Sequence, residues 1–271
     1  MNLPLYAPSD DPGPSFTSLL GQHGLRPEYS VSAKGADAGN LAESELKITH
    51  GTTVVAARYA DGVIIAGDRR ATSGNLISHR TMEKVFKADR WSGVAIAGAA
   101  GPAIEMVKLF QLQLEHYEKV EGHSLSLEGK ANQLSQMLRN HLPAAMQGMA
   151  VVPIFAGFDR RRDYGRLFAF DVTGGRYEEE DYVASGSGSL HARTVIKLGH
   201  RDDLTREEGV DLLIKALFTA ADDDSATGGP DSMRGIYPLV ATISAEGYVA
   251  VEEDEIADRF NTVIADFAER A

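Results

Sequence analysis

Residues 51–59 read Gly51-Thr52-Thr53-Val54-Val55-Ala56-Ala57-Arg58-Tyr59, and this stretch decides how the rest of the chain is interpreted. From residue 53 to residue 59 it is β-branched and apolar, which predicts a strand, and Asp61-Gly62 predicts a tight turn into a second strand at 63–66. A threonine hydroxyl is a weak nucleophile unless a base lies within hydrogen-bonding reach. Cleavage of the Gly51–Thr52 bond would give Thr52 a free α-amino group beside its own hydroxyl, and that amine can act as the base.

Strand and helix patterns alternate in blocks along the rest of the chain. Strands are predicted at 85–88, 91–97, 151–158, 166–172, 176–179, 237–244 and 248–251, and helices at 103–120, 127–147, 190–198, 205–221 and 255–270. Thr205 and Glu208 form a capping-box signal, and Pro143 is expected to kink or shorten its helix. This order predicts an α+β fold, a four-layer αββα sandwich of two stacked antiparallel sheets flanked by helices.

The first 50 residues differ from the rest because they hold half of the chain's ten prolines. Such a composition is typical of a weakly ordered tail or linker. Its abrupt end at Gly51-Thr52 favours a propeptide instead. We therefore expect two parts, a propeptide at 1–51 that is removed on maturation and a single catalytic domain at 52–271.

Composition excludes several classes of function. The net charge of −12 argues against a nucleic-acid binder, because phosphate contacts need a clustered basic face. The chain has no cysteine, which excludes disulfides, thiolate metal sites and a cysteine nucleophile. No apolar run is long enough to span a bilayer and no signal peptide is visible, so a cytoplasmic location without membrane contact is expected.

Five further blocks follow the threonine pair at fixed distances. They are Gly67-Asp68-Arg69-Arg70-Ala71-Thr72, Lys84, Ala97-Gly98, Gly186-Ser187-Gly188-Ser189 and Asp224-Ser225-Ala226-Thr227-Gly228-Gly229. Alone, each has an ordinary interpretation, such as a turn salt bridge, a glycine-rich linker or the acidic end of a helix. Together, in this order and spacing across residues 52–251, they closely resemble the proteasome β subunits, with the actinobacterial 20S type as the nearest match.

The resemblance implies an N-terminal-nucleophile hydrolase fold and a threonine endopeptidase matured by autocatalytic cleavage at Gly51–Thr52. Thr52 is implied as the nucleophile, and its released α-amine, with an ordinary pKa of about 7.7–8.0, as the general base. A nearby Lys84 ammonium would lower the pKa of that amine through like-charge repulsion. Asp68 would pair with Lys84, because an unpaired buried ammonium is costly.

Three more positions receive roles from the resemblance. The backbone N–H of Gly98 is implied as the oxyanion donor. Ser187 and Asp224 match positions that hydrogen-bond around the terminal amine, and Thr227 stands where the family often has serine. Because three aspartates occupy 222–224, the register allows a slip, and Asp224 fits the family spacing best.

The substrate pocket beside the nucleophile is assigned by family offset. It comprises Ala71, Thr72, Met82, Phe86, Ile96, Ala100 and Ile104. The set is uncharged and mostly apolar, which predicts cleavage after hydrophobic residues.

Partners also follow from the resemblance: α-type subunits and other copies of the chain, as two β heptamers between two α heptamers, and unfolded protein substrates. An ATPase ring acting through the α ring is expected, because the chain lacks a Gly-x-x-x-x-Gly-Lys-Ser/Thr phosphate loop of its own. The eight histidines show no metal-site spacing, so neither a metal nor a cofactor is expected.

Three other interpretations compete with this one. A structural ring subunit without chemistry would typically lack the nucleophile or the lysine, whereas Thr52, Asp68 and Lys84 are all present. The two-tier hexameric bacterial peptidase related to the proteasome is shorter and lacks the long second-half helices. Another N-terminal-nucleophile hydrolase, such as an amidase, is disfavoured by the combined Gly-Asp-Arg-Arg and Asp-x-x-Thr-Gly-Gly blocks.

Overall fold

The computed structural model describes residues 51–268 apart from Asn75. The predicted propeptide, except for Gly51, lies outside the described residues. All described residues belong to one compact unit. Across residues 51–268, no helix is both long and apolar enough to cross a membrane.

The strands are β1 (Thr53–Tyr59), β2 (Gly62–Gly67), β3 (Ala71–Ser73), β4 (Leu76–His79), β5 (Val85–Asp89), β6 (Ser92–Gly98), β7 (Val151–Asp159), β8 (Tyr164–Phe170), β9 (Arg176–Glu179), β10 (Tyr182–Gly186), β11 (Leu239–Ser244) and β12 (Gly247–Ala250). The helices are α2 (Ala100–Glu121), α3 (Leu127–Ala145), α4 (Ser189–Gly199), α5 (Arg206–Asp223) and α6 (Glu253–Ala268).

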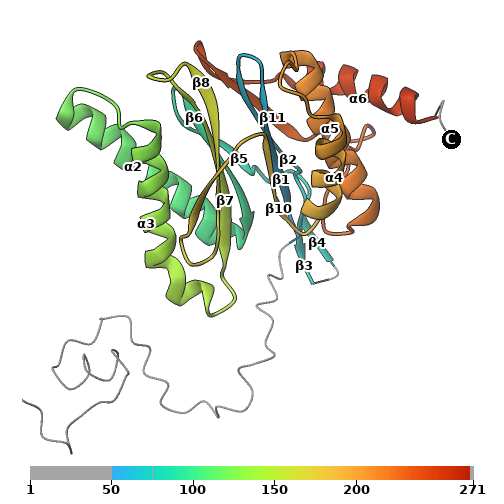
Figure 1. Ribbon diagram of the computed structural model, residues 1–271. Helices are drawn as coiled ribbons and strands as arrows, with labels where there is room; N and C mark the ends of the chain where they lie inside the picture. The colour runs from blue at the N-terminus through green and yellow to red at the C-terminus, as the bar shows by residue number, and fades with distance from the viewer. Residues whose placement is uncertain (1–50, 75, 269–271) are drawn as a thin grey trace, which may run out of the picture. The chain divides into compact units, whose positions relative to one another are not determined.

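Two five-stranded antiparallel sheets form the centre of the fold. One has the order β10-β1-β2-β11-β12 and the other β5-β6-β7-β8-β9, while β3 and β4 form a separate two-stranded sheet. Helices α2 and α3 cover the outer face of the second sheet, and α4 and α5 cover the outer face of the first (Figure 1). The predicted αββα sandwich is confirmed.

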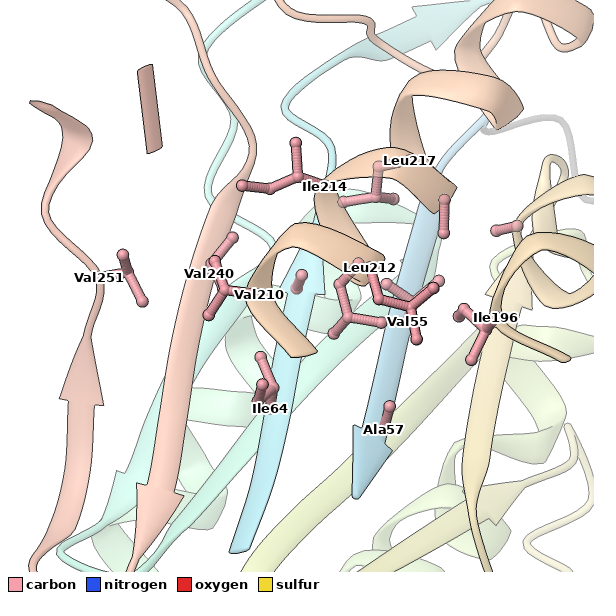
Figure 2. Close-up of a cluster of buried hydrophobic side chains, with 14 of the residues drawn as sticks. Val55, Ala57, Ile64, Ile196, Val210, Leu212, Ile214, Leu217, Val240 and Val251 are labelled. Atoms are coloured by element: carbon pink, nitrogen blue, oxygen red, sulfur yellow. The ribbon is translucent and has the colours of Figure 1, made fainter. Parts of the chain in front are cut away.

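Strict alternation along the central strands explains why the fold has four layers. Successive side chains of a strand point to opposite faces of a sheet. Val54 and Ala56 of β1 join the cluster between the two sheets, whereas Val55 and Ala57 join the cluster beneath α4 and α5. Figure 2 shows this second cluster, in which Val55 lies near Leu212 and Ile196. A strand buried on both faces needs consecutive apolar residues, as β1 has from Val54 to Ala57.

Most predicted elements are present within a few residues, with instructive exceptions. The strand predicted at 166–172 lies at 164–170, and β3, β4 and β10 were not predicted. Pro143 stands in the last turn of α3, which ends two residues later. Leu109 and Leu112 of α2 fit the helical spacing, yet their side chains are exposed, so spacing alone did not identify the buried face.

The sheet register brings distant segments to the start of β1. Thr53 pairs with Gly186 at the end of β10, and Val54 pairs with Gly67 at the end of β2. Ser187 and Asp68 directly follow these two strand ends. Both residues are therefore held on either side of the Thr52-Thr53 pair by the backbone ladder.

Candidate active site

Thr52 is buried, and its side chain faces the peptide bond that precedes it. The Thr52 hydroxyl donates a hydrogen bond to the Gly51 carbonyl oxygen over 2.7 Å. The Thr52 carbonyl oxygen accepts from the Ser187 N–H at 2.9 Å, and the Thr52 N–H donates to Ser187 Oγ at 3.4 Å. The Gly51 N–H in turn donates to Thr72 Oγ1 at 3.2 Å. The Gly51–Thr52 bond is thus held from both sides, with the hydroxyl directed at it.

Gly51 has no room for a side chain. A Cβ atom there would lie 1.8 Å from Ala226 Cβ and 2.7 Å from Ala226 Cα. Distances below 3 Å to backbone atoms require the surrounding loop to move. A glycine is therefore needed at the residue before Thr52 for this bond to stay in its observed position.

The predicted pair of Asp68 and Lys84 is present and fully buried. Lys84 Nζ lies 2.6 Å from Asp68 Oδ1, and neither side chain is exposed to solvent. The ammonium also donates to the Arg70 carbonyl oxygen at 2.5 Å. Asp68 follows β2 directly and Lys84 precedes β5, so the pair joins the two sheets.

The remaining acceptor sites of Asp68 are also used. Its Oδ1 accepts from the Thr53 N–H at 2.8 Å, and its Oδ2 accepts from the N–H groups of Arg70 at 2.9 Å and Gly228 at 2.8 Å. With the Lys84 ammonium, the carboxylate therefore has four donors. Asp68 therefore fixes the lysine, the start of β1 and the loop after α5 together.

Burial lowers the pKa of the Lys84 ammonium, although the charge of Asp68 and its hydrogen bond oppose that shift. An ammonium has three N–H donors, and Asp68 and Arg70 take two of them within the described residues. The third is left for another acceptor near Asp68. A lysine of lowered pKa in such a place is suited to electrostatic or proton-transfer work.

Ser187 and Asp224 meet where the N-terminal end of α4 lies beside the C-terminal end of α5. Ser187 Oγ lies 2.5 Å from Asp224 Oδ2, Thr227 Oγ1 lies 2.6 Å from the same oxygen, and the Ala226 N–H donates to Oδ1 at 3.1 Å. Burial raises the pKa of the Asp224 carboxyl, but these hydrogen bonds outweigh burial and hold its pKa below the usual range. Asp224, rather than either neighbouring aspartate, occupies this position, as the spacing predicted.

Gly98 ends β6 in a conformation that favours glycine. Its φ is +107°, and a Cβ atom would lie 2.2 Å from the Ala150 carbonyl oxygen. The glycine is therefore needed for the sharp exit from the strand into α2. Its role as an oxyanion donor stays a prediction.

The predicted pocket residues lie on β3, β5, β6, α2 and the loop before β5. Phe86 and Ile104 pack against the cluster beneath α2 and α3, which contains Ile96. Ala100 opens α2, and Met82, half-buried, donates its N–H to the Arg69 carbonyl oxygen. Ala71 and Thr72 lie on β3, where Thr72 touches Gly51. Their joint role as a substrate pocket stays a prediction.

Three side chains that could ligate a metal ion lie together elsewhere in the described part of the chain. Asp181, His200 and Asp202 place one ligand atom each within 4.8 Å of one another. His200 caps the C-terminal end of α4, whereas Ser187 precedes its N-terminal end. The three residues are therefore separate from the site at Thr52.

The sequence did not predict the contacts that two threonines make around Thr52. Thr53 was interpreted only as a strand residue, yet its side chain is fully buried and its Oγ1 lies 2.5 Å from Thr227 Oγ1. Thr72 was assigned to the substrate pocket rather than to Gly51. Both contacts join residues far apart in the chain, so no local pattern could have indicated them.

The chain has an αββα sandwich, and its β1 strand begins beside the buried Thr52 and the Lys84–Asp68 pair. This combination is that of the N-terminal-nucleophile hydrolases. Residues 48–234 match the family model described as "Proteasome subunit". A protein named "Proteasome subunit beta" from Acidimicrobium ferrooxidans is 56% identical over 256 residues, which cover 94% of this chain and 91% of the relative.

Two other relatives bear the same name. The Streptomyces griseus protein is 55% identical over 82% of this chain and 79% of its own length. The Jonesia denitrificans protein is 49% identical over 93% of this chain and 82% of its own length. The chain belongs to the proteasome subunit family. Within it, this is a catalytic subunit of the β type, a threonine peptidase.

Proposed function

We propose that Thr52 is the nucleophile of this peptidase and that the chain matures by cutting its own Gly51–Thr52 bond. The observation that carries the proposal is the 2.7 Å contact between the Thr52 hydroxyl and the Gly51 carbonyl oxygen. The hydroxyl already lies beside the group that it would attack.

In the maturation step, Thr52 Oγ1 adds to the Gly51 carbonyl carbon, and the hydroxyl proton passes through a water molecule toward the Thr52 nitrogen. The tetrahedral intermediate then breaks its C–N bond as the nitrogen takes up that proton, which leaves an ester between Gly51 and Thr52 and a free α-amine. Water hydrolyses the ester and leaves Gly51 as a carboxylate. The chain now begins at Thr52 with both a hydroxyl and an amine.

In the peptidase reaction the same hydroxyl attacks a substrate carbonyl, and the new amine of Thr52 accepts the hydroxyl proton. That proton then passes to the leaving amine of the product, and water hydrolyses the acyl ester. Lys84 would support the peptidase reaction by favouring the neutral amine through like-charge repulsion. Gly98 would donate its N–H to the oxyanion.

Two variants test the nucleophile. Thr52→Ala removes the hydroxyl, so we expect a chain that assembles, keeps residues 1–51 and shows no peptidase activity. Thr52→Ser keeps the hydroxyl and should still be processed. Intact mass of both chains after co-expression with an α-type subunit measures the outcome, and processing of Thr52→Ala would show that another site cuts the bond.

The assembly belongs to the same proposal. The names of the relatives support assembly with α-type subunits and with other copies of the chain. We propose two β heptamers between two α heptamers, with an ATPase ring that delivers unfolded substrates through the α ring. A cytoplasmic location, expected from composition, is part of it. Native mass spectrometry of the co-expressed subunits would give the ring stoichiometry, and cell fractionation would give the location.

A further inference from the structure

A series of hydrogen bonds, buried at Thr53 and Thr227 and exposed at Ser187, connects β1 to the residues around the Thr52 nitrogen. Thr53 Oγ1 lies 2.5 Å from Thr227 Oγ1, Thr227 Oγ1 lies 2.6 Å from Asp224 Oδ2, and Ser187 Oγ lies 2.5 Å from the same oxygen. The Thr52 N–H donates to Ser187 Oγ at the other end. Thr53 and Thr227 are fully buried, so water does not supply alternative partners for them.

The charge of Asp224 fixes the direction of every proton in this series. A carboxylate only accepts, so Ser187 and Thr227 must each donate their single hydroxyl proton to it. Because the Thr227 proton is used in this way, the contact between Thr53 and Thr227 requires Thr53 to donate. The Gly188 N–H completes the arrangement by donating to Thr53 Oγ1 at 3.0 Å.

This order of protons leaves Ser187 as an acceptor toward the Thr52 nitrogen. The other acceptor within reach of the Ser187 hydroxyl, the Thr52 carbonyl oxygen, is 3.5 Å away, whereas Asp224 Oδ2 is 2.5 Å away, so Ser187 donates its proton to Asp224. If Ser187 instead donated to the mature amine, it would occupy the lone pair that must take the proton of the Thr52 hydroxyl.

We propose that Thr53 is a positioning residue: its hydroxyl donates to Thr227 Oγ1 and so supports the hydrogen bonds to Asp224 that leave Ser187 an acceptor and the Thr52 amine free to act as a base. The inference rests on the proposed function of Thr52. Successive hydrogen bonds polarise one another, so the Thr53 hydroxyl acts on Ser187 through the two residues between them.

Thr53 also begins a strand and accepts the Gly188 N–H, so a purely structural role must be distinguished from a role in positioning Ser187. Three variants make this distinction. Thr53→Val keeps the shape and removes the hydroxyl, and Thr53→Ser keeps the hydroxyl. Thr242→Val is the matched control, because Thr242 is a buried threonine of the same sheet, on β11.

The test measures kcat and KM on a fluorogenic peptide, with kcat normalised to the processed fraction found by intact mass. For Thr53→Val we expect kcat to fall about tenfold, the rate equivalent of one strong hydrogen bond, with KM unchanged. Thr53→Ser and Thr242→Val should stay within about twofold of the wild type. In a Ser187→Ala background, Thr53→Val should lower kcat no further, because both variants act through the same acceptor.

Three results would overturn the inference. They are an unchanged kcat in Thr53→Val, an equal loss in Thr53→Ser, or a loss that adds fully to that of Ser187→Ala. If Thr53→Val does not assemble, Thr227→Val breaks the next link of the same series and carries the same expectations. A wild-type chain that is never processed overturns the proposed function and this inference with it, whereas a processed, active wild type with additive variants overturns the inference alone.

Discussion

The Lys84 ammonium and the Asp68 carboxylate lie 2.6 Å apart, and both side chains are wholly removed from solvent. Burying one charge without its partner is strongly unfavourable, because the low-dielectric interior does not replace the lost hydration. The pair is therefore part of the structural core as well as of the candidate active site. Any variant of either residue changes stability and chemistry together.

Removing the lysine alone should destabilise the fold. Lys84→Met leaves the Asp68 anion buried and unpaired, so we expect a loss of about 3–5 kcal/mol in the free energy of unfolding. Lys119→Met is the matched control, because Lys119 pairs with Glu115 on the exposed surface of α2 and such pairs contribute little. Urea unfolding of the unassembled precursor measures both. Equal effects of the two variants would contradict a buried, charged pair.

Enlarging Gly51 should block maturation without harming the fold. The Cβ of Gly51→Ala would meet Ala226 Cβ at 1.8 Å and displace the peptide bond from the Thr52 hydroxyl. Because a displacement of about 1 Å costs roughly a hundredfold in rate, we expect processing to slow by about that factor. Gly101→Ala is the control, since a Cβ there has no neighbour within 4 Å. Processing of Gly51→Ala at the wild-type rate would show that the bond is not held as observed.

The loop between β8 and β9 should give a measurable pH dependence of stability. A hydrogen bond from the Thr173 hydroxyl, against the opposing effect of burial, and others from the Gly175 N–H and the Tyr177 hydroxyl, lower the pKa of Asp171 to about 2. A carboxyl whose pKa is lower in the folded than in the unfolded state stabilises the fold above its unfolded pKa of about 3.9. That contribution is lost as the pH falls toward 2.

Asp171→Asn tests this, because asparagine does not titrate. The difference in Tm between wild type and Asp171→Asn should be largest near pH 6 and should shrink between pH 4 and pH 2. A difference that stays constant over this range would mean that the charge of Asp171 does not stabilise the loop.

Cleavage preference tests the predicted pocket. Phe86, Ile96 and Ile104 are uncharged and pack together, so peptides that end in leucine or tyrosine before the reporter group should be cut faster than those that end in arginine or glutamate. Assembled, processed enzyme and four matched fluorogenic peptides measure the ranking. Faster cleavage after arginine or glutamate would mean that charged residues outside this set line the pocket.

The fold was predictable from the sequence wherever burial makes apolar residues recur at a regular spacing. The predicted bounds of β1 agree with the structure because every second residue faces one of two apolar layers. The short strands β3, β4 and β10 were missed because three to five residues carry little periodic signal. The exposed Leu109 and Leu112 show that an apolar residue on a helix need not face the core of its own subunit.

The active site was predictable as a set of residues but not as a network. Motif spacing identified Thr52, Asp68, Lys84, Ser187 and Asp224, which the structure brings to the start of β1. The contacts of Thr53 with Thr227 and Gly188 depend on the register between β1 and β10 and on the packing of α4 against α5. Such long-range geometry leaves no local mark in the sequence.

The most direct test of the central claim is intact mass with N-terminal sequencing of this chain after co-expression with an α-type subunit. We predict a mature chain whose first residue is Thr52, present only when position 52 carries a hydroxyl. A chain that assembles into active rings while retaining Gly51 would contradict the account, because the Thr52 amine would then never exist to act as the base.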